Sequence, residues 1–135
     1  MKFTFFSAIP VMSLCFLFFV PQSVSAQAKS VDPYTQTAID ADKRAKELYQ
    51  PVQTLEISFQ KKTDKKTKYA LVEAYMKFGN YMMLESPVSP RSKYRPALKA
   101  YNRVLELDKS NEEAAKNKKQ IEDIYTQMGM PIPKD

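Results

Sequence analysis

Apolar residues recur at helical spacing along nearly the whole chain after residue 32, and this feature most narrows the folds open to it. The first such stripe consists of Ala38, Ala41, Ala45 and Leu48. Residues three or four positions apart lie on one face of an α-helix, so the stripe would face a core. Asp32 supplies a capping side chain, and Pro33 suits the first helical position. We therefore expect an all-α protein whose first helix runs from Pro33 to about Tyr49.

The segment around Pro51 continues this pattern. A second stripe consists of Leu48, Val52, Leu55 and Phe59. Pro51 either kinks the first helix or begins the next one, because proline lacks a backbone N–H group. Leu55, Ile57 and Phe59 also alternate as they would in a β-strand, but one short strand would have no partner. Helix is therefore the favoured prediction, and it ends in the polar, basic stretch 61–68.

Three further helices are predicted toward the C-terminus. They span residues 65–78, residues 94–107, and a last segment that is capped by Ser110 or Asn111. Glu112 and Glu113 lie in the first turn of the last helix, where the helix dipole favours carboxylates. Its apolar side consists of Ala114, Ile121, Ile124 and Met128. Gly129 is suited to ending this helix, and residues 129–135 then form an extended tail.

The helices over 65–78 and 94–107 resemble the two halves of one tetratricopeptide repeat. The residues that match the family's pattern, with Lys77 and Asn80 in its turn, are Leu71, Val72, Tyr75, Phe78, Gly79, Tyr81, Tyr94, Ala97, Tyr101, Val104, Leu105, Leu107 and Asp108. Gly79 would close the first helix in a left-handed conformation. A tyrosine fits the same family position at both Tyr81 and Tyr94, so residues 82–93 are interpreted as an insertion in the turn. Pro87 and Pro90 prevent this insertion from being helical throughout.

This resemblance implies a fold and a function. The fold is a short α-solenoid of about five antiparallel helices over residues 33–128, and the function is protein–protein interaction. One clear repeat is fewer than a free-standing solenoid needs, so residues 33–60 or a second copy of the chain would complete the stack.

The resemblance also implies a partner-binding surface on the first helix of the repeat. The family lines its groove with outward positions that correspond here to Lys66, Tyr69, Glu73, Met76 and Lys77. The alternative is that the preceding helix or residues 82–84 cover this surface. Members that clamp a peptide carboxylate have an asparagine where this chain has Glu73, so that specificity is not expected.

The N-terminal residues predict export. Lys2 precedes an apolar stretch over residues 3–20, and the small residues at 24–26 fit signal peptidase. The pattern predicts a signal peptide over residues 1–26, cleaved before Gln27, and a short linker over residues 27–32. The alternative is an uncleaved membrane anchor, because the apolar stretch is near the lower length limit for a spanning helix. We expect a periplasmic or secreted protein.

The missing residue types argue against catalysis. The chain has no His, two Gly and a single Cys, Cys15, which leaves with the signal peptide. Histidine acid–base chemistry, cysteine nucleophiles, Cys/His zinc sites and glycine-rich phosphate loops are thereby excluded. Leu14 before Cys15 does not fit a lipoprotein acylation site. Adjacent carboxylates such as Glu112 and Glu113 point in different directions on a helix. We expect no enzyme, no metal site and no cofactor.

Basic residues form two clusters in a chain of net charge +6. The first cluster is Lys61, Lys62, Lys65, Lys66 and Lys68, and the second is Arg91, Lys93, Arg95, Lys99 and Arg103. Such clusters either keep an exported protein soluble or dock on anionic lipid, a cell-wall polymer or an acidic protein.

The sequence thus leaves three kinds of function open. The main hypothesis is an adaptor or assembly factor of the bacterial cell envelope that binds a protein or peptide. The alternative is a basic envelope-surface protein that binds anionic lipid or polymer, with only peripheral membrane contact. Self-association through exposed helix faces is the third possibility, and nucleic acid is not an expected partner.

Overall fold

The structure is a computed structural model that describes residues 31–134. The predicted signal peptide and most of the predicted linker lie outside the described residues. The elements are α1 (Pro33–Ala41), α2 (Lys43–Lys61), α3 (Lys65–Asn80), the π-helical segment η1 (Tyr81–Glu85), α4 (Pro90–Leu107) and α5 (Glu112–Gln127). No strand occurs in residues 31–134, so the all-α prediction is confirmed. None of the helices in this range is long and apolar enough to cross a membrane.

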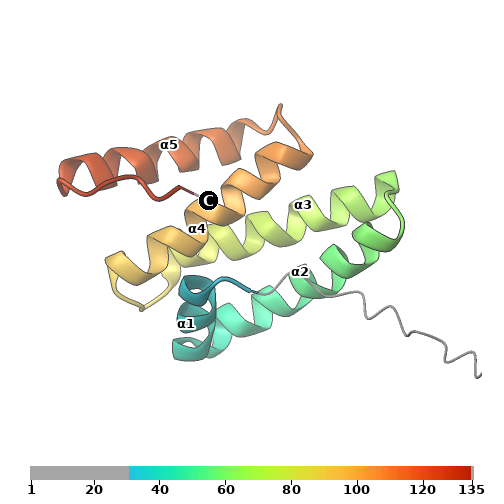
Figure 1. The fold of residues 1–135 in the computed structure, drawn as a ribbon, viewed down its shortest axis with the longest axis horizontal. Helices are drawn as coiled ribbons and strands as arrows, with labels where there is room; N and C mark the ends of the chain where they lie inside the picture. The colour runs from blue at the N-terminus through green and yellow to red at the C-terminus, as the bar shows by residue number, and fades with distance from the viewer. Residues whose placement is uncertain (1–30, 135) are drawn as a thin grey trace, which may run out of the picture.

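The four longer helices lie side by side, each antiparallel to the next (Figure 1). Helix α3 packs between α2 and α4, and α5 packs on α4. The short helix α1 contacts both α2 and α4 at one end of this stack (Figure 1). As a result, α2 and α4 form two ridges on either side of α3.

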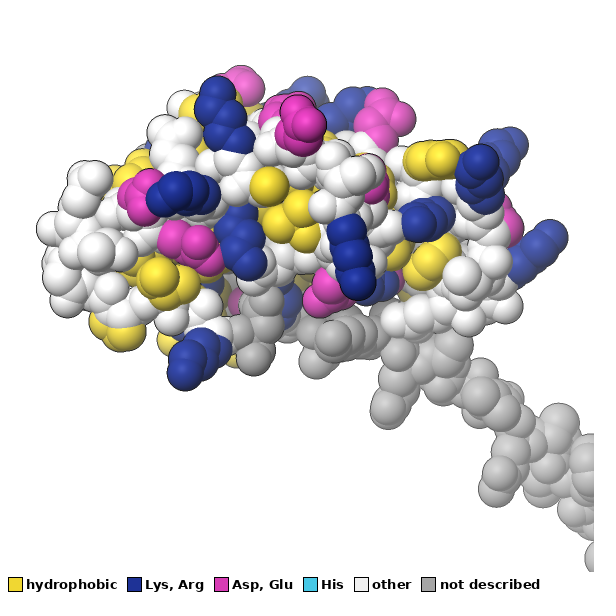
Figure 2. All heavy atoms as spheres, turned by 90° about the horizontal axis from the view of Figure 1, so that it is seen from above, with side chains coloured by type: hydrophobic (Ala, Val, Ile, Leu, Met, Phe, Trp, Pro, Cys, Tyr) yellow, Lys and Arg dark blue, Asp and Glu magenta, His cyan; other side chains and the backbone are white. Residues whose placement is uncertain are grey.

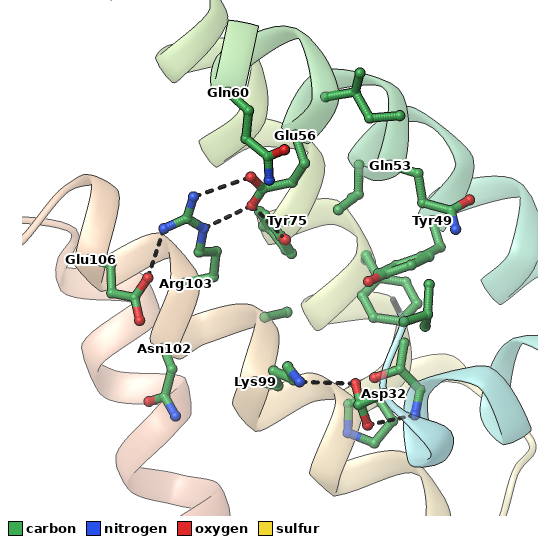
Figure 3. Close-up of a pocket in the computed structure, with 17 residues that line it drawn as sticks. Asp32, Tyr49, Gln53, Glu56, Gln60, Tyr75, Lys99, Asn102, Arg103 and Glu106 are labelled. Atoms are coloured by element: carbon green, nitrogen blue, oxygen red, sulfur yellow. Dashed lines mark hydrogen bonds and ion pairs between the residues drawn. The ribbon is translucent and has the colours of Figure 1, made fainter. Parts of the chain in front are cut away.

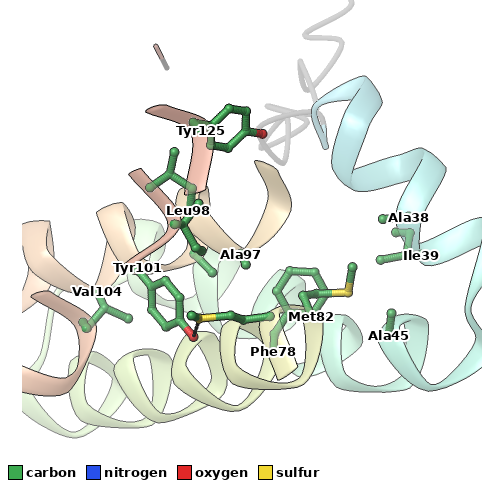
Figure 4. Packing of buried hydrophobic residues seen from close by; sticks show 14 residues of the cluster. Ala38, Ile39, Ala45, Phe78, Met82, Ala97, Leu98, Tyr101, Val104 and Tyr125 are labelled. Carbon is green, nitrogen blue, oxygen red and sulfur yellow. Dashed lines mark hydrogen bonds between the residues drawn. The ribbon is translucent and has the colours of Figure 1, made fainter. Parts of the chain in front are cut away.

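The core lies where α3, η1 and α4 face one another, with α1 and α5 covering it (Figure 4). Its buried residues are Ala38, Ile39, Ala45, Phe78, Met82, Met83, Ala97, Leu98, Ala100, Tyr101, Val104, Ala114, Ile121 and Tyr125. Among the residues predicted to define the repeat, the buried ones are Leu71, Phe78, Gly79, Ala97, Tyr101, Val104 and Leu107. Tyr75, Tyr81 and Tyr94 are only half-buried.

The first helix ends earlier than predicted. The expected helix from Pro33 to Tyr49 is divided at Asp42, whose backbone is extended, with φ −136° and ψ 106°. The Asp42 side chain accepts hydrogen bonds from the backbone N–H groups of Arg44 and Ala45 and thereby caps α2. The break leaves Ala41 exposed, so it does not belong to a buried stripe.

Pro51 neither begins nor ends a helix. It lies inside α2 and is exposed, so its ring does not disturb the core. Proline cannot donate the hydrogen bond that a helical residue normally gives to the fourth residue before it, here Glu47. Leu55 and Phe59 lie in the same helix, so the helical prediction for this segment is confirmed.

Gly79 does not close a helix as predicted. It lies inside α3, and the one glycine with positive φ in residues 31–134 is Gly129. A Cβ atom at Gly79 would lie 3.0 Å from Cε1 of Tyr101. The small residue is therefore needed because α4 packs closely against α3 at this point.

The predicted insertion is mostly helical. The chain continues from α3 into η1, where the Ser86 N–H donates to the Tyr81 carbonyl oxygen at 2.9 Å, an i to i+5 bond. Met82 and Met83 are buried, so this segment belongs to the core. Helix α4 then starts at Pro90 instead of Tyr94, because proline at the first helical position sacrifices no hydrogen bond.

The last helix follows the prediction at both ends. Asn111 caps α5 through a 2.9 Å bond from the Ala114 N–H group, and Gly129 follows the helix with φ 65°. Its buried side contains Tyr125, however, and Met128 is exposed. Residues 130–134 belong to no helix or strand, and Met130 packs against the core.

Candidate binding groove between two helices

The five residues predicted to bind a partner lie on α3. Lys66, Tyr69, Glu73 and Lys77 are exposed, and Met76 is half-buried against the core. Lys77 Nζ lies 2.7 Å from Glu73 Oε1, so these two charges pair with each other. Met82 and Met83 do not cover this surface, because they are buried elsewhere. The surface is open, and none of its five residues lines the groove described next.

A groove of about 680 Å³ lies between the ridges formed by α2 and α4. Its lining residues come from α1, α2, α3 and α4, so it depends on the packing of all four helices (Figure 3). Those used below are Asp32, Tyr49, Gln53, Glu56, Gln60, Tyr75, Phe78, Lys99, Asn102 and Arg103. The volume is within the range of ordinary ligand-binding clefts.

Aromatic rings form the apolar part of the groove. The ring centroids of Tyr49 and Phe78 lie 4.8 Å apart and the ring planes make an angle of 56°. Aromatic pairs favour such tilted arrangements. Phe78 is 1% exposed, so it anchors the groove to the core. Tyr75 lies one turn before Phe78 in α3 and contributes a third ring. Tyr49 and Tyr75 are half-buried, so their rings can offer apolar surface to a bound side chain.

An ion pair links the two ridges at one end of the groove. The Arg103 guanidinium on α4 donates from Nε to Glu56 Oε1 at 2.8 Å and from Nη2 to Glu56 Oε2 at 3.1 Å (Figure 3). Tyr75 donates its hydroxyl to Glu56 Oε1 at 2.8 Å. A carboxylate that accepts a bidentate pair of hydrogen bonds from a guanidinium group is held in a fixed orientation. This cluster therefore fixes the distance between α2 and α4.

A second ion pair closes the other end. Lys99 on α4 places Nζ 3.1 Å from Asp32 Oδ2 (Figure 3). The same aspartate caps α1 by accepting from the backbone N–H groups of Tyr34 and Thr35. One carboxylate thus orients both the start of α1 and a lysine of the groove.

The surroundings shift the pKa values of Asp32, Tyr49, Tyr75 and Arg103 away from neutrality. Burial raises the pKa of Tyr49 to about 12, and the nearby Asp32 and Glu56 carboxylates add to this effect. Burial and the Glu56 carboxylate raise the pKa of Tyr75 well above its usual range. Burial alone would raise the pKa of Asp32, but hydrogen bonds from Thr35 and the Lys99 charge bring it below its ordinary value. The hydrogen bond to Glu56 raises the pKa of Arg103.

Sequence reasoning missed this groove. Arg103 and Lys99 belong to the second basic cluster of the sequence, and no sequence motif includes Glu56 or Tyr49. Glu56 and Arg103 are 47 positions apart, and no spacing rule relates two such residues on different helices. The one indication in the sequence is the apolar stripe of α2, of which Leu48, Leu55 and Phe59 are only half-buried.

Comparisons with protein-family models, with curated proteins and with solved structures found no match to this chain. Among residues 31–134, no group of His, Cys, Asp and Glu side chains could hold a metal ion. The functional conclusion therefore depends on the chemistry of the groove itself.

Proposed function

We propose that the chain is an exported protein–protein interaction module, an adaptor or assembly factor of the cell envelope, that holds a peptide segment of its partner in the groove between α2 and α4. The single observation that carries the proposal is the groove, with an aromatic floor between two polar ridges. Aromatic surface supplies the apolar contact area that dominates peptide recognition.

The polar side chains of the groove favour a peptide as the ligand. Gln53 and Gln60 are exposed and present side-chain amides along its wall. A primary amide can both donate and accept hydrogen bonds, so it can pair with the N–H and C=O groups of a peptide backbone. The acidic and basic residues of the groove pair largely with one another, which leaves no strong preference for one sign of charge.

The titration properties support binding over acid–base chemistry. A general acid or base works best when its pKa lies near the working pH. The pKa values of Tyr49, Tyr75 and Arg103 are raised and that of Asp32 is lowered, and each shift moves the group away from neutrality.

The relationship to tetratricopeptide repeats is part of this proposal. Helices α3 and α4 form an antiparallel pair in which Gly79 allows close approach of Tyr101, although Gly79 does not close a helix as the resemblance implied. The N-terminal residues support export by their composition.

A display experiment tests the groove as the peptide site. Random peptides displayed on phage are selected on the immobilised protein, which is purified after expression of the full chain. Gln53→Trp places a bulky ring in the groove. We expect it to weaken binding of the selected peptides at least about tenfold, which is the loss typical of a hot-spot contact. The matched control is Gln50→Trp, which adds the same ring to the same helix outside the groove.

The α3 surface provides the competing site in this experiment. Tyr69→Ala removes its most exposed ring, which is 59% exposed, without touching the groove. Peptides that lose binding with Tyr69→Ala but retain it with Gln53→Trp would move the site to the α3 surface. The same selection is run on an unrelated helical protein of similar charge. If no peptide is enriched on this chain relative to that control, the interaction-module proposal is wrong.

A further inference from the structure

The five lysines of the first basic cluster gather at one end of the molecule, where α2 turns into α3. We define this basic end by its residues Lys61, Lys62, Lys65, Lys66 and Lys68. Figure 2 shows that Lys and Arg side chains outnumber Asp and Glu side chains at the right-hand end of the molecule, the same end at which α2 meets α3 in Figure 1. The basic end is separate from the groove, because none of its lysines lines the groove.

Two of the five residues of the second basic cluster pair with carboxylates inside the molecule. Lys99 pairs with Asp32, and Arg103 pairs with Glu56 and Glu106. Arg95 stacks over the Tyr34 ring, with its Cζ atom 3.6 Å from the ring centroid. The charges of Lys99 and Arg103 are therefore engaged with carboxylates of the fold itself.

Within residues 31–134 the basic end lacks such ion pairs, although Lys65 lies over the Tyr69 ring. None of its five lysines forms an ion pair with another described residue. Asp64, the acidic residue within this stretch, caps α3 by accepting from the N–H and hydroxyl groups of Thr67. Lys65 and Lys66 also occupy the first turn of α3, where the helix dipole disfavours cations. The charges thus lie where they weaken the helix, which argues against a purely structural role.

We propose that the basic end docks the protein on the surface of an anionic lipid bilayer. A flat array of negative head groups needs no shaped cavity, and flexible lysines at a protruding turn can reach it. Tyr69 is 59% exposed beside these lysines, with Lys65 Nζ 5.6 Å from its ring centroid. Tyrosine is favoured at the head-group level of membranes, because its ring is apolar and its hydroxyl is polar. The aromatic neighbour favours a bilayer over an acidic protein.

Vesicle sedimentation tests the proposal. The probe is phosphatidylcholine vesicles with and without phosphatidylglycerol, and the protein is purified after expression of the full chain. The ratio of binding between the two vesicle types cancels any contribution from the apolar N-terminal residues. We expect binding to the anionic vesicles to fall steeply with added salt. Replacing Lys62 and Lys66 with Gln should weaken it about 25-fold, or about fivefold for each lysine near the surface.

The matched control replaces Lys43 and Lys46, two exposed lysines at the opposite end of α2. It makes the same change in net charge, and we expect less than a twofold effect. Lys62→Arg with Lys66→Arg should retain binding. Because Lys66 lies in the first turn of α3, the Gln variant should unfold at the same temperature as the wild type or higher.

Three results would overturn the proposal. The first is equal binding to both vesicle types, and the second is an equal loss in the basic-end and control variants. The third is binding to polyglutamate without binding to anionic vesicles, which would assign the basic end to an acidic protein. A failure of peptide display leaves this test unaffected, because the groove and the basic end share no residue.

Discussion

At the residue scale, Gly79 and Tyr101 show how one missing side chain shapes the packing. The Tyr101 ring is 0% exposed and lies against Gly79. Its hydroxyl donates to Asn80 Oδ1 at 2.7 Å and accepts from Asn117 Nδ2 at 3.2 Å. These bonds connect α3, α4 and α5, so the ring cannot move without disturbing all three helices.

Gly79→Ala is therefore expected to destabilise the protein, although alanine is the better helix former. The new Cβ would lie 3.0 Å from Tyr101 Cε1 and 3.3 Å from the Cβ atom of Ala100. Overpacking should outweigh the gain of about 1 kcal/mol in helix propensity, giving a net loss of about 1 kcal/mol. Thermal unfolding monitored by circular dichroism measures this loss. A rise in the unfolding temperature would contradict the prediction and show that the Tyr101 ring moves to accommodate the new methyl group.

Asp42 is the second residue with long-range consequences. Its carboxylate is buried and accepts hydrogen bonds from the hydroxyl groups of Tyr81 at 3.0 Å and Ser86 at 2.8 Å. It also accepts from the N–H groups that begin α2. The same side chain thus ends the first helical stretch and attaches it to η1.

At the element scale, η1 explains how the chain passes from α3 to the loop before α4. Its wider turn accommodates one more residue than an α-helical turn would. This places Met82 and Met83 in the core and leaves Leu84 67% exposed. It also brings the hydroxyls at both of its ends, those of Tyr81 and Ser86, to Asp42. The π-helical segment is therefore a means of positioning, which is a common use of such turns.

The pairing of α2 with α4 depends on the cluster around Arg103. Arg103→Gln should cost about 2 kcal/mol of unfolding free energy, because it leaves the partly buried Glu56 carboxylate without its charged partner. The side chains of this pair are 31% and 19% exposed. Urea unfolding measures the loss.

The control for this prediction is Arg44→Gln. Arg44 pairs with Glu47 on one helix, and these side chains are 61% and 48% exposed. Exposed pairs of this kind contribute about 0.5 kcal/mol or less. Equal losses in the two variants would contradict the role given to Arg103 in holding α2 and α4 together.

At the scale of the whole molecule, carboxylates join elements that lie far apart in the sequence. Asp32 connects α1 to α4, Asp42 connects α2 to η1, and Glu56 connects α2 to α4. Protonation of these carboxylates should weaken the contacts between the elements, so we expect the free energy of unfolding to fall in acid.

Acid unfolding tests this expectation with Asp42. Burial alone would raise its pKa, but hydrogen bonds from Ser86 and Tyr81 bring the pKa below its ordinary value. A lowered pKa means that the unfolded chain binds more protons in acid, so this stabilisation is full above about pH 5 and is lost as the pH falls below about 4. Urea unfolding should show this decline in the wild type.

Asp42→Asn provides the comparison. The variant should be about 2 kcal/mol less stable at neutral pH, because a neutral amide accepts these hydrogen bonds more weakly than a carboxylate. It should also lose less stability on acidification, since one linked proton is gone. Parallel declines in the two proteins would show that other carboxylates dominate the acid response.

Features that depend on neighbouring residues could be predicted from the amino-acid sequence. Apolar stripes specified helices, Asp32 and Asn111 specified two helix starts, and Gly129 specified the last helix end. Each of these acts within about one helical turn, so its partners are visible in the local sequence.

The break at Asp42, the role of Gly79 and the groove depend on contacts between residues that are distant in the sequence. Asp42 meets hydroxyls 39 and 44 positions away, Gly79 meets a ring on the next helix, and Glu56 meets Arg103 across α3. Local propensity favoured a continuous helix through residue 42 and a helix end at Gly79. Buried polar groups and close-packed rings overrode it, because their partners come together only when the helices pack.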